Sequence, residues 1–215
     1  MLSLARAGVV LLLLTAASVG AQAKPDKPAS FEALLAAFAR MPGLEASFVE
    51  EKRLGLLAKP LESRGKLYFA RPSYLLRRVE TPSRSEVVIT PNELRLKSAD
   101  GEQTLDLRAR PEVRPFIESL TWLLAGNHRA LAGVYTIAFE PGAGHAWSVR
   151  LLPKGEPISR LIQSIRIAGD GLRVSQIEVR ETSGDETRTR IVDANPQRRF
   201  DAAEMRRLFG AGAAK

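Results

Sequence analysis

The sequence predicts a mostly β fold, an antiparallel sheet accompanied by a few helices. From Leu44 onward, apolar and polar residues alternate along most of the chain, as in Leu94-Arg95-Leu96-Lys97. A period of two is typical of strands with one buried and one solvated face. Turn sequences such as Asp100-Gly101 separate the alternating segments, and such pairs tolerate the positive φ of tight hairpins. No strand–helix–strand spacing that would indicate a parallel sheet is visible.

The composition fits one globular domain and excludes several functions. The chain has 215 residues, of which 45% are hydrophobic, and a net charge of +8, which excludes a disordered protein. It contains no cysteine, so disulfides, thiol catalysis and lipidation of an N-terminal cysteine are excluded. We place a single domain at residues 29–209 and a flexible tail at residues 210–215.

The first 23 residues are typical of a secretory signal peptide. Arg6 supplies a positive charge, residues 9–14 are apolar, and Ala21-Gln22-Ala23 is a small-x-small cleavage site. We expect cleavage after Ala23 and export, the alternative being an uncleaved anchor. An exported basic protein does not routinely meet nucleic acid, so we expect no nucleic-acid partner. Its charge either favours anionic lipid headgroups or forms a solvated face.

Two longer helices and a short one are predicted. Ser30 can cap a helix that runs to about Arg40. One apolar face of this helix consists of Phe31, Leu34, Leu35 and Phe38. Pro115 suits the first position of a second helix. Its apolar stripe consists of Phe116, Leu120, Leu123 and Leu124. We expect a third, short helix from Asp201 to Phe209.

Between these helices we expect roughly eight to ten strands in a meander-like order. The alternating apolar residues assigned to strands are Leu67 and Phe69, Leu94 and Leu96, Leu105 and Leu107, Tyr135, Ile137 and Phe139, Trp147, Val149 and Leu151, Ile165 and Ile167, and Ile177 and Val179. Thr187 to Val192 is typical of a last long strand.

The sequence contains no recognisable catalytic motif. G-x-S-x-G, P-loop and H-E-x-x-H patterns do not occur. His128 and His145 have no second ligand at metal-binding spacing, so we expect surface-loop histidines and no metal site. Glu50 and Glu51 are neighbours, and neighbouring residues of a strand point to opposite faces, so they make a poor acid–base pair. We expect a protein that is not an enzyme, and a hydrolase with a spatially assembled site remains an alternative.

A sheet of this size has an apolar face that the two longer helices can cover only in part. If the sheet curls into an open barrel, the space beneath the helices is an apolar cavity. Such a cavity suits acyl chains better than sugars or nucleotides. The alternative is a fully packed core, because alternation does not reveal voids.

Several short segments occur in the order found in one known family. They are Leu44–Glu50 (L-E-A-S-F-V-E), Gly65–Pro72 (G-K-L-Y-F-A-R-P), Thr81-Pro82, Pro115–Ile117, Leu151–Lys154 (L-L-P-K) and Gly169–Gly171. Over residues 30 to 209 this ordered set resembles the LolA family, the periplasmic outer-membrane lipoprotein carriers of Gram-negative bacteria.

The resemblance implies an incomplete β-barrel with a helical lid over an apolar cavity, in a monomeric periplasmic carrier without a cofactor. The cavity would hold the acyl chains of a lipoprotein or another lipid in transit from an inner-membrane donor complex to an outer-membrane acceptor. Arg71 lies at the position whose arginine holds the lid closed in the family. The residues expected in the cavity and lid are Phe31, Leu34, Leu35, Phe38, Leu67, Phe69, Leu75, Leu94, Leu96, Phe116, Leu120 and Leu124.

The sequence also departs from the pattern of the family. Arg77 stands where the family has an aromatic residue, often Trp, and Thr90-Pro91-Asn92 replaces an Asp-Gly turn. We expect Arg77 at the rim of the cavity, where it would favour an anionic or glycolipid cargo. The alternative function is that of a periplasmic sensor or adaptor, which would bind a protein partner through the sheet edge and hold no internal lipid.

Overall fold

The computed structural model describes residues 30–110 and 114–211, apart from the side chain of Phe116. The predicted signal peptide at residues 1–23 lies outside the described residues, as do residues 212–215 of the predicted tail. The Phe116 side chain, which we expected in the lid, also lies outside them.

A single antiparallel sheet of eleven strands dominates the described chain, as the alternation predicts. Its order in space is β6-β5-β4-β3-β2-β1-β11-β10-β9-β8-β7. The strands are β1 (Gly43–Arg53), β2 (Leu61–Ala70), β3 (Tyr74–Thr81), β4 (Ser85–Ile89), β5 (Glu93–Ser98), β6 (Gly101–Asp106), β7 (Tyr135–Pro141), β8 (Ala146–Pro153), β9 (Ile162–Asp170), β10 (Arg173–Glu181) and β11 (Glu186–Asn195). Two meanders, β1–β6 and β7–β11, therefore join where β1 pairs with β11.

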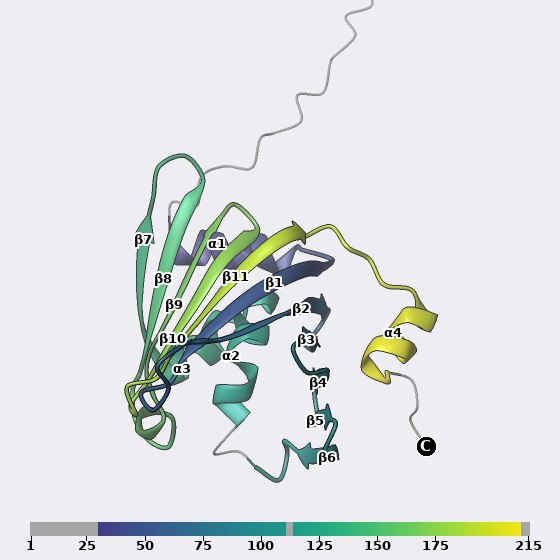
Figure 1. Ribbon diagram of the computed structural model, residues 1–215. Helices are drawn as coiled ribbons and strands as arrows, with labels where there is room; N and C mark the ends of the chain where they lie inside the picture. Colours follow the sequence, from purple (N-terminus) through teal and green to yellow (C-terminus); the bar gives the residue numbers. More distant parts are fainter. Residues whose placement is uncertain (1–29, 111–113, 212–215) are drawn as a thin grey trace, which may run out of the picture.

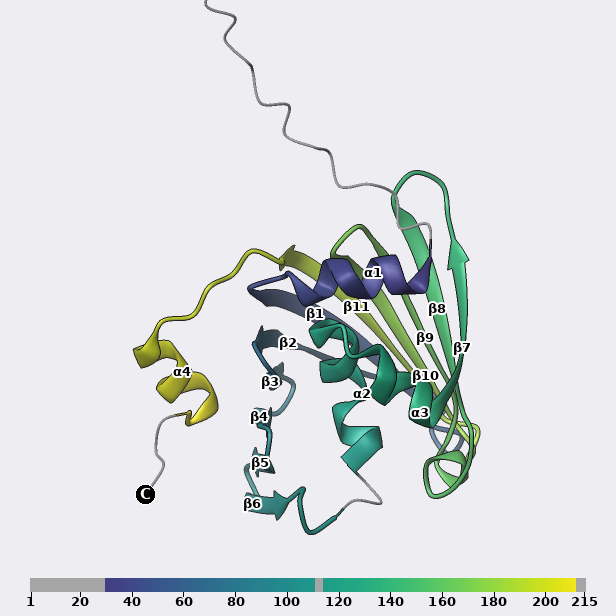
Figure 2. The ribbon, with the colours of Figure 1, turned by 180° about the vertical axis from the view of Figure 1, so that it is seen from behind.

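The sheet curls strongly but does not close, so the barrel is incomplete (Figure 1). Strands β6 and β7 form its two edges and do not pair with each other. Helices α2 (Arg114–Ala125) and α3 (His128–Val134) lie between the two arms of the sheet on its concave side (Figure 2). The predicted incomplete barrel is thus confirmed.

Like β3, in which the buried neighbours Leu75 and Leu76 face opposite sides of the sheet, strand β4 is not revealed by alternation. Its segment Val87-Val88-Ile89 is continuously apolar because both faces of the strand pack against other apolar residues. Val87 and Ile89 face the interior of the barrel, whereas Val88 packs on the outer face of the sheet. This explains why the structure has more strands than the eight to ten expected.

Helix α1 (Phe31–Ala39) closes one end of the barrel, and it begins where the sequence predicts. The side chain of Ser30 accepts a hydrogen bond of 3.2 Å from the backbone N–H of Ala33, which satisfies one of the free donors of the first turn. The predicted apolar face is buried in full: Phe31, Leu34, Leu35 and Phe38 are each at most 5% exposed.

Helix α3 differs from the prediction, which placed His128 in a surface loop. His128 is instead the first residue of α3, where Asn127 caps the helix by accepting a 3.1 Å hydrogen bond from the Ala130 N–H. The helix has only seven residues, which is too short for a helical period to be visible in the sequence. His145 lies in a turn, as expected.

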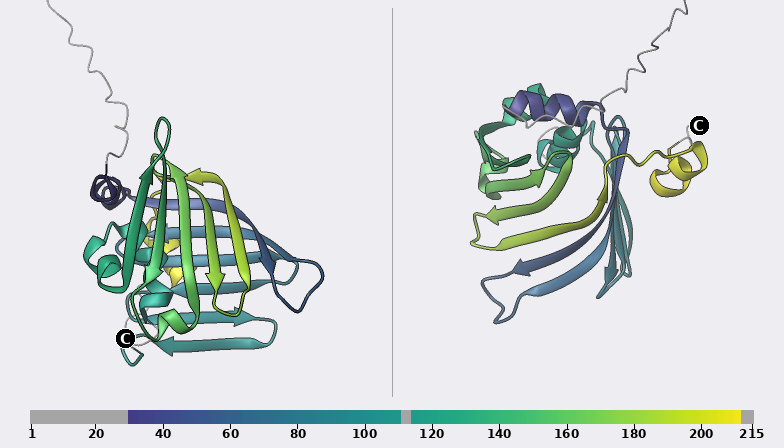
Figure 3. Two further views of the ribbon diagram at one scale, coloured as in Figure 1. Left: turned by 90° about the vertical axis from the view of Figure 1, so that its left-hand side faces the viewer. Right: turned by 90° about the horizontal axis from the view of Figure 1, so that it is seen from above.

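Helix α4 (Ala202–Phe209) confirms the third predicted helix, but it lies on the convex side of the sheet, away from the other three helices (Figure 3). Asp201 and Glu204 form a capping box at its start. Phe209 is fully buried against Leu76 and Val88 in a small second core. Among the described residues, no helix is long and apolar enough to cross a membrane.

Candidate functional site

An apolar cavity of about 400 Å³ lies between helix α2 and the concave face of the sheet. Most of its lining side chains are aliphatic or aromatic: Phe48, Leu67, Leu75, Val87, Ile89, Leu94, Ile117, Leu120, Leu151, Ile165, Ile167, Ile177, Val179 and Ile191. The polar lining residues are Glu50, Arg77, Ser119, Thr187 and Thr189. The volume falls within the range of small-molecule sites, about 300–1,000 Å³.

The strand side of the cavity consists of side chains at alternate positions along the strands. Ile165 and Ile167 of β9 lie opposite Val179 and Ile177 of β10 in the ladder, so all four side chains share the concave face. Helix α2 contributes Leu120 and its neighbour one turn earlier, Ile117. The alternation of apolar and polar residues thus correctly indicates which face of each strand points into the cavity. The apolar stripe of α2 indicates the helix that covers this face.

The residues predicted for the cavity and lid divide into two groups. Leu67, Leu75, Leu94 and Leu120 line the cavity. The others with described side chains, apart from Leu96, pack into the solid core beside the cavity: Phe31, Leu34, Leu35, Phe38, Phe69 and Leu124. Helix α1 therefore seals one end of the barrel with a packed core, while α2 covers the hollow part.

The expectation for Leu96 is wrong, because this side chain is 41% exposed and does not line the cavity. Leu96 lies opposite the half-buried Val87 on β4 and the exposed Gln103 on β6. The concave face is no longer covered at this point of β5. Alternation identifies the face on which Leu96 lies, but it does not show how far along the strand the cover reaches.

Arg71, which follows β2 and for which the resemblance implies a contact with the lid, binds the backbone at the end of helix α1. Its Nη2 donates a hydrogen bond to the carbonyl oxygen of Ala39, the last residue of α1. The last carbonyl groups of a helix have no partner within the helix, so Arg71 satisfies one of them. Arg71 Nη1 is buried and has no hydrogen-bond partner among the described residues. Whether this contact controls opening remains a prediction.

Arg77 lies on the cavity wall and forms an ion pair there. Its Nη2 donates to Glu50 Oε1 at 2.8 Å, reaching from β3 across β2 to β1. Its guanidinium carbon lies 4.5 Å from the centre of the Phe48 ring, a distance at which a cation is attracted to an aromatic face. The other carboxylate oxygen of Glu50 accepts a 2.9 Å hydrogen bond from Thr189.

Sequence reasoning missed Glu50 because it treated this residue only as half of a pair with Glu51. A signal was nevertheless present, since Glu50 shares the parity of Ala46 and Phe48 on β1, both of which are buried. A carboxylate that continues an apolar stripe is a candidate for a site in the interior. Its partner Arg77 lies on a strand that is not adjacent in the sheet, so no spacing in the sequence indicates the pair.

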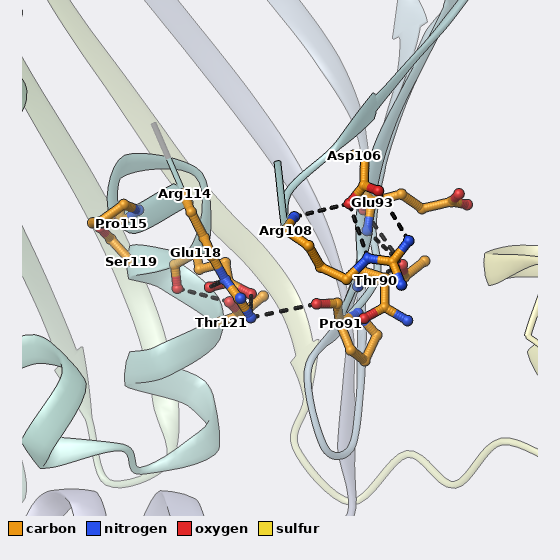
Figure 4. Close-up of polar contacts among 11 residues, drawn as sticks. Thr90, Pro91, Glu93, Asp106, Arg108, Arg114, Pro115, Glu118, Ser119 and Thr121 are labelled. Carbon is orange, nitrogen blue, oxygen red and sulfur yellow. Dashed lines mark hydrogen bonds and ion pairs between the residues drawn. The ribbon is translucent and has the colours of Figure 1, made fainter. Parts of the chain in front are cut away.

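Helix α2 is attached to one arm of the sheet through Arg114 (Figure 4). Arg114 Nε donates to Glu118 Oε2 at 2.7 Å, and Arg114 Nη2 donates to the carbonyl oxygen of Pro91 in the β4–β5 turn at 3.4 Å. The Glu118 side chain is only 3% exposed. The hydrogen bond between Arg114 and the Glu118 carboxylate raises the pKa of the Arg114 guanidinium. The Thr90-Pro91-Asn92 turn, a departure from the family pattern, therefore supplies an acceptor for the helix.

The same helix is attached to the other arm through Ser119. Its Oγ lies 2.6 Å from the hydroxyl oxygen of Tyr135 at the start of β7. Ser119 also donates to the Pro115 carbonyl oxygen at 2.5 Å. Burial raises the pKa of the Tyr135 hydroxyl, so this group is neutral at ordinary pH. Helix α2 thus bridges both arms of the open barrel by a few polar contacts.

The residues that the structure describes contain no group of three His, Asp or Glu side chains placed to hold a metal ion. The polar residues of the cavity wall are two hydroxyl-bearing threonines, one serine and the Arg77–Glu50 pair. This arrangement can hold an apolar chain and offer a charged contact at one place.

Residues 23–209 match the family described as outer membrane lipoprotein carrier protein LolA-like. A search of curated proteins finds no match.

Several solved structures are similar at low sequence identity. A LolA superfamily protein from Nitrosomonas europaea is 9% identical, with 81% of this chain and 96% of that chain covered and a TM-score of 0.43. A DUF1329 family protein from Desulfovibrio piger is 11% identical, with 88% and 100% covered and a TM-score of 0.47. The Pseudomonas aeruginosa MucA/MucB complex gives 13% identity, 81% and 60% coverage and a TM-score of 0.48.

The family match extends over most of the chain, including every described helix and strand. It confirms the resemblance noted in the sequence. The description of the family names a lipoprotein carrier protein, which agrees with the expectation that the chain is not an enzyme. The protein therefore belongs to the LolA-like family of outer membrane lipoprotein carrier proteins.

Proposed function

We propose that this protein is a periplasmic carrier that holds the acyl chains of a lipoprotein or another lipid and moves them between the inner and outer membranes. The observation that carries the proposal is the aliphatic cavity of about 400 Å³ beneath α2. The signal-like segment at residues 1–23 and the family match support a periplasmic location.

The energetics of burial are consistent with carriage. Each buried methylene contributes about 0.8 kcal/mol, so a fully buried chain of sixteen carbons would gain roughly 12 kcal/mol. A carrier without an energy source can release such a ligand only if the closed empty state is itself favourable. Leu120 and Ile117 pack over the empty cavity from α2, and ligand entry displaces these contacts.

Few polar contacts attach the lid helices to the sheet. Arg71 binds the end of α1, while Arg114 and Ser119 attach α2 to the two arms of the sheet. A hydrogen bond of this kind contributes about 1 kcal/mol net. The polar contacts of one helix therefore account for only part of the cost of opening. The larger part is the exposure of apolar side chains such as Leu120 and Leu123, which offsets the gain from burying an acyl chain.

A binding experiment with a matched control tests the proposal. The delipidated mature chain is titrated with a fluorescent fatty-acyl probe, and lipids extracted from the purified protein are identified by mass spectrometry. We expect micromolar binding that Leu120→Asn weakens at least about tenfold, because Asn places an unpaired amide on the cavity wall. Leu161→Asn is the control, since Leu161 is 56% exposed and does not line the cavity.

Absence of both co-purified lipid and probe binding, in a chain that circular dichroism shows to be folded, would contradict the carrier function. The second candidate, an adaptor that binds a protein partner, would then take its place. The edge strand β6 favours this candidate, because most of its residues are exposed and its outer edge has no partner strand in the sheet.

A further inference from the structure

We propose that the Arg77–Glu50 pair is a binding site for an anionic group on the cargo, so that the preferred ligand is an acyl chain bearing a carboxylate or a phosphate. The inference rests on the proposed carrier function and specifies the class of its ligand. Arg77 and Glu50 are the charged residues among the side chains that line the cavity in the part of the chain that the structure describes.

The pair is accessible from the cavity rather than sealed in the core. The side chain of Arg77 is 30% exposed and that of Glu50 is 18% exposed. Phe48 lies beneath the guanidinium and restricts its orientation. The charged end of a ligand whose chain lies along the aliphatic wall can therefore reach the guanidinium.

The ion pair is not needed to hold the sheet together. Strands β1 and β2 are joined by a continuous antiparallel ladder, and β2 and β3 by a ladder with one register shift at Gly65, so their pairing does not depend on a contact from β3 to β1. The two side chains are partly exposed, and ion pairs that remain accessible to solvent contribute little net stability. A pair placed in this wall is thus better explained by a ligand than by stability.

Arg77 retains the capacity to bind an anion while it is paired. A guanidinium carries five N–H donors on a planar fork, and the contact with Glu50 uses Nη2. Glu50 neutralises Arg77 in the empty cavity and is itself kept in place by Thr189. Glu50 therefore competes with the ligand for the guanidinium, and it limits the affinity of the site so that the cargo can be released.

The competition predicts opposite effects for the two members of the pair. Arg77→Gln should weaken the binding of an anionic amphiphile about tenfold, because it removes the cationic partner. Glu50→Gln should tighten the same binding several-fold, because it removes the competing carboxylate. Neither substitution should change the binding of an uncharged amphiphile of the same chain length.

The test uses two matched probes, a dansyl-labelled undecanoic acid and its methyl ester, with the folded mature protein. The wild-type protein should bind the acid more tightly than the ester, and Arg77→Gln should abolish that difference. Arg78→Gln is the control, because Arg78 is the next residue on β3 and its 2.6 Å ion pair with Glu86 lies on the opposite face of the sheet. It should bind both probes like the wild type. Thermal unfolding of each variant shows whether the fold is intact.

Each result distinguishes this inference from the proposed function. Equal binding of acid and ester by the wild type would overturn the anion site and leave the acyl carrier in place. A parallel loss of both probes in Arg77→Gln, or weaker acid binding in Glu50→Gln, would show that the pair has a structural role and would also overturn the site. Failure of both probes to bind the wild type would overturn the carrier function itself.

Discussion

Gly65 occupies a position on β2 where no side chain fits. A Cβ atom built there would lie 1.9 Å from the carbonyl oxygen of Arg78 and 3.0 Å from Cε1 of Phe48. Strand β2 has a register shift against β3 at this point, which brings the backbone of β3 unusually close. The absence of a side chain thus lets the Phe48 ring lie beneath the Arg77 guanidinium.

Gly65→Ala should therefore lower the free energy of unfolding by at least about 2 kcal/mol, because the contact with Arg78 involves backbone that cannot move aside easily. Gly55→Ala is the control, since nothing lies within 4 Å of a Cβ atom at that position. Urea unfolding followed by circular dichroism measures both. Equal stability of the two variants would show that β3 shifts freely at this bulge.

Arg71 joins the sheet to the lid through one contact with the end of α1. Arg71→Leu should accelerate the exchange of a bound acyl probe several-fold, because the closed lid loses this hydrogen bond. The unfolding temperature should fall only slightly, since Arg71 is partly exposed and the α1 core beside it is intact. Stopped-flow probe release and thermal unfolding are measured in parallel. A large loss of thermal stability with unchanged release would assign Arg71 a structural role.

At the scale of elements, α2 is the part of the lid that covers the hollow, and buried polar residues determine its position. Glu118 is a nearly fully buried carboxylate whose partner is Arg114, one turn earlier. Removing one member of such a pair leaves an uncompensated charge, which is more costly than removing both. The attachment of α2 is thus sensitive to single substitutions on its polar side.

Arg114→Met should lower the free energy of unfolding by about 2 kcal/mol, a value below the fully buried limit because Arg114 itself is 40% exposed. The double variant Arg114→Met/Glu118→Leu should recover part of that loss. Arg160→Met is the control, because Arg160 and Glu156 form an exposed pair with the same spacing of four residues. It should change stability by less than about 0.5 kcal/mol. An equal effect of both single substitutions would show that burial of Glu118 is unimportant.

At the scale of the whole molecule, the sequence predicts the sheet and the longer helices because local patterns specify them. Ser30 and the apolar stripe that follows it specify α1, and alternation specifies the inward faces of the strands. Three elements are not revealed by these patterns, for physical reasons. On β3, Leu75 faces the interior and its neighbour Leu76 packs on the outer face. Val88 packs on the outer face and interrupts the alternation of β4, and α3 is too short to show a period.

The candidate site is harder to predict than the fold, because it depends on which parts of the concave face remain uncovered. Leu120 and Phe38 both belong to helical stripes, yet one lines the cavity and the other packs in a solid core. Arg77 is identified from its departure from the family pattern, but its partner Glu50 is not. The two residues meet across an intervening strand, and such a contact has no signature in a single sequence.

The pairing of β1 with β11 also determines the order in which the chain can fold. Each meander can form from contacts between neighbouring hairpins, but the ladder that places Phe48 opposite Ile191 joins the first strand to the last. Contacts between residues so distant in the chain form slowly. Because the cavity wall takes residues from both meanders, neither half has a complete binding surface before β11 docks. The proposed binding of an acyl chain therefore requires the β1–β11 ladder to be in place, and a chain without that ladder exposes the apolar faces of two incomplete sheets.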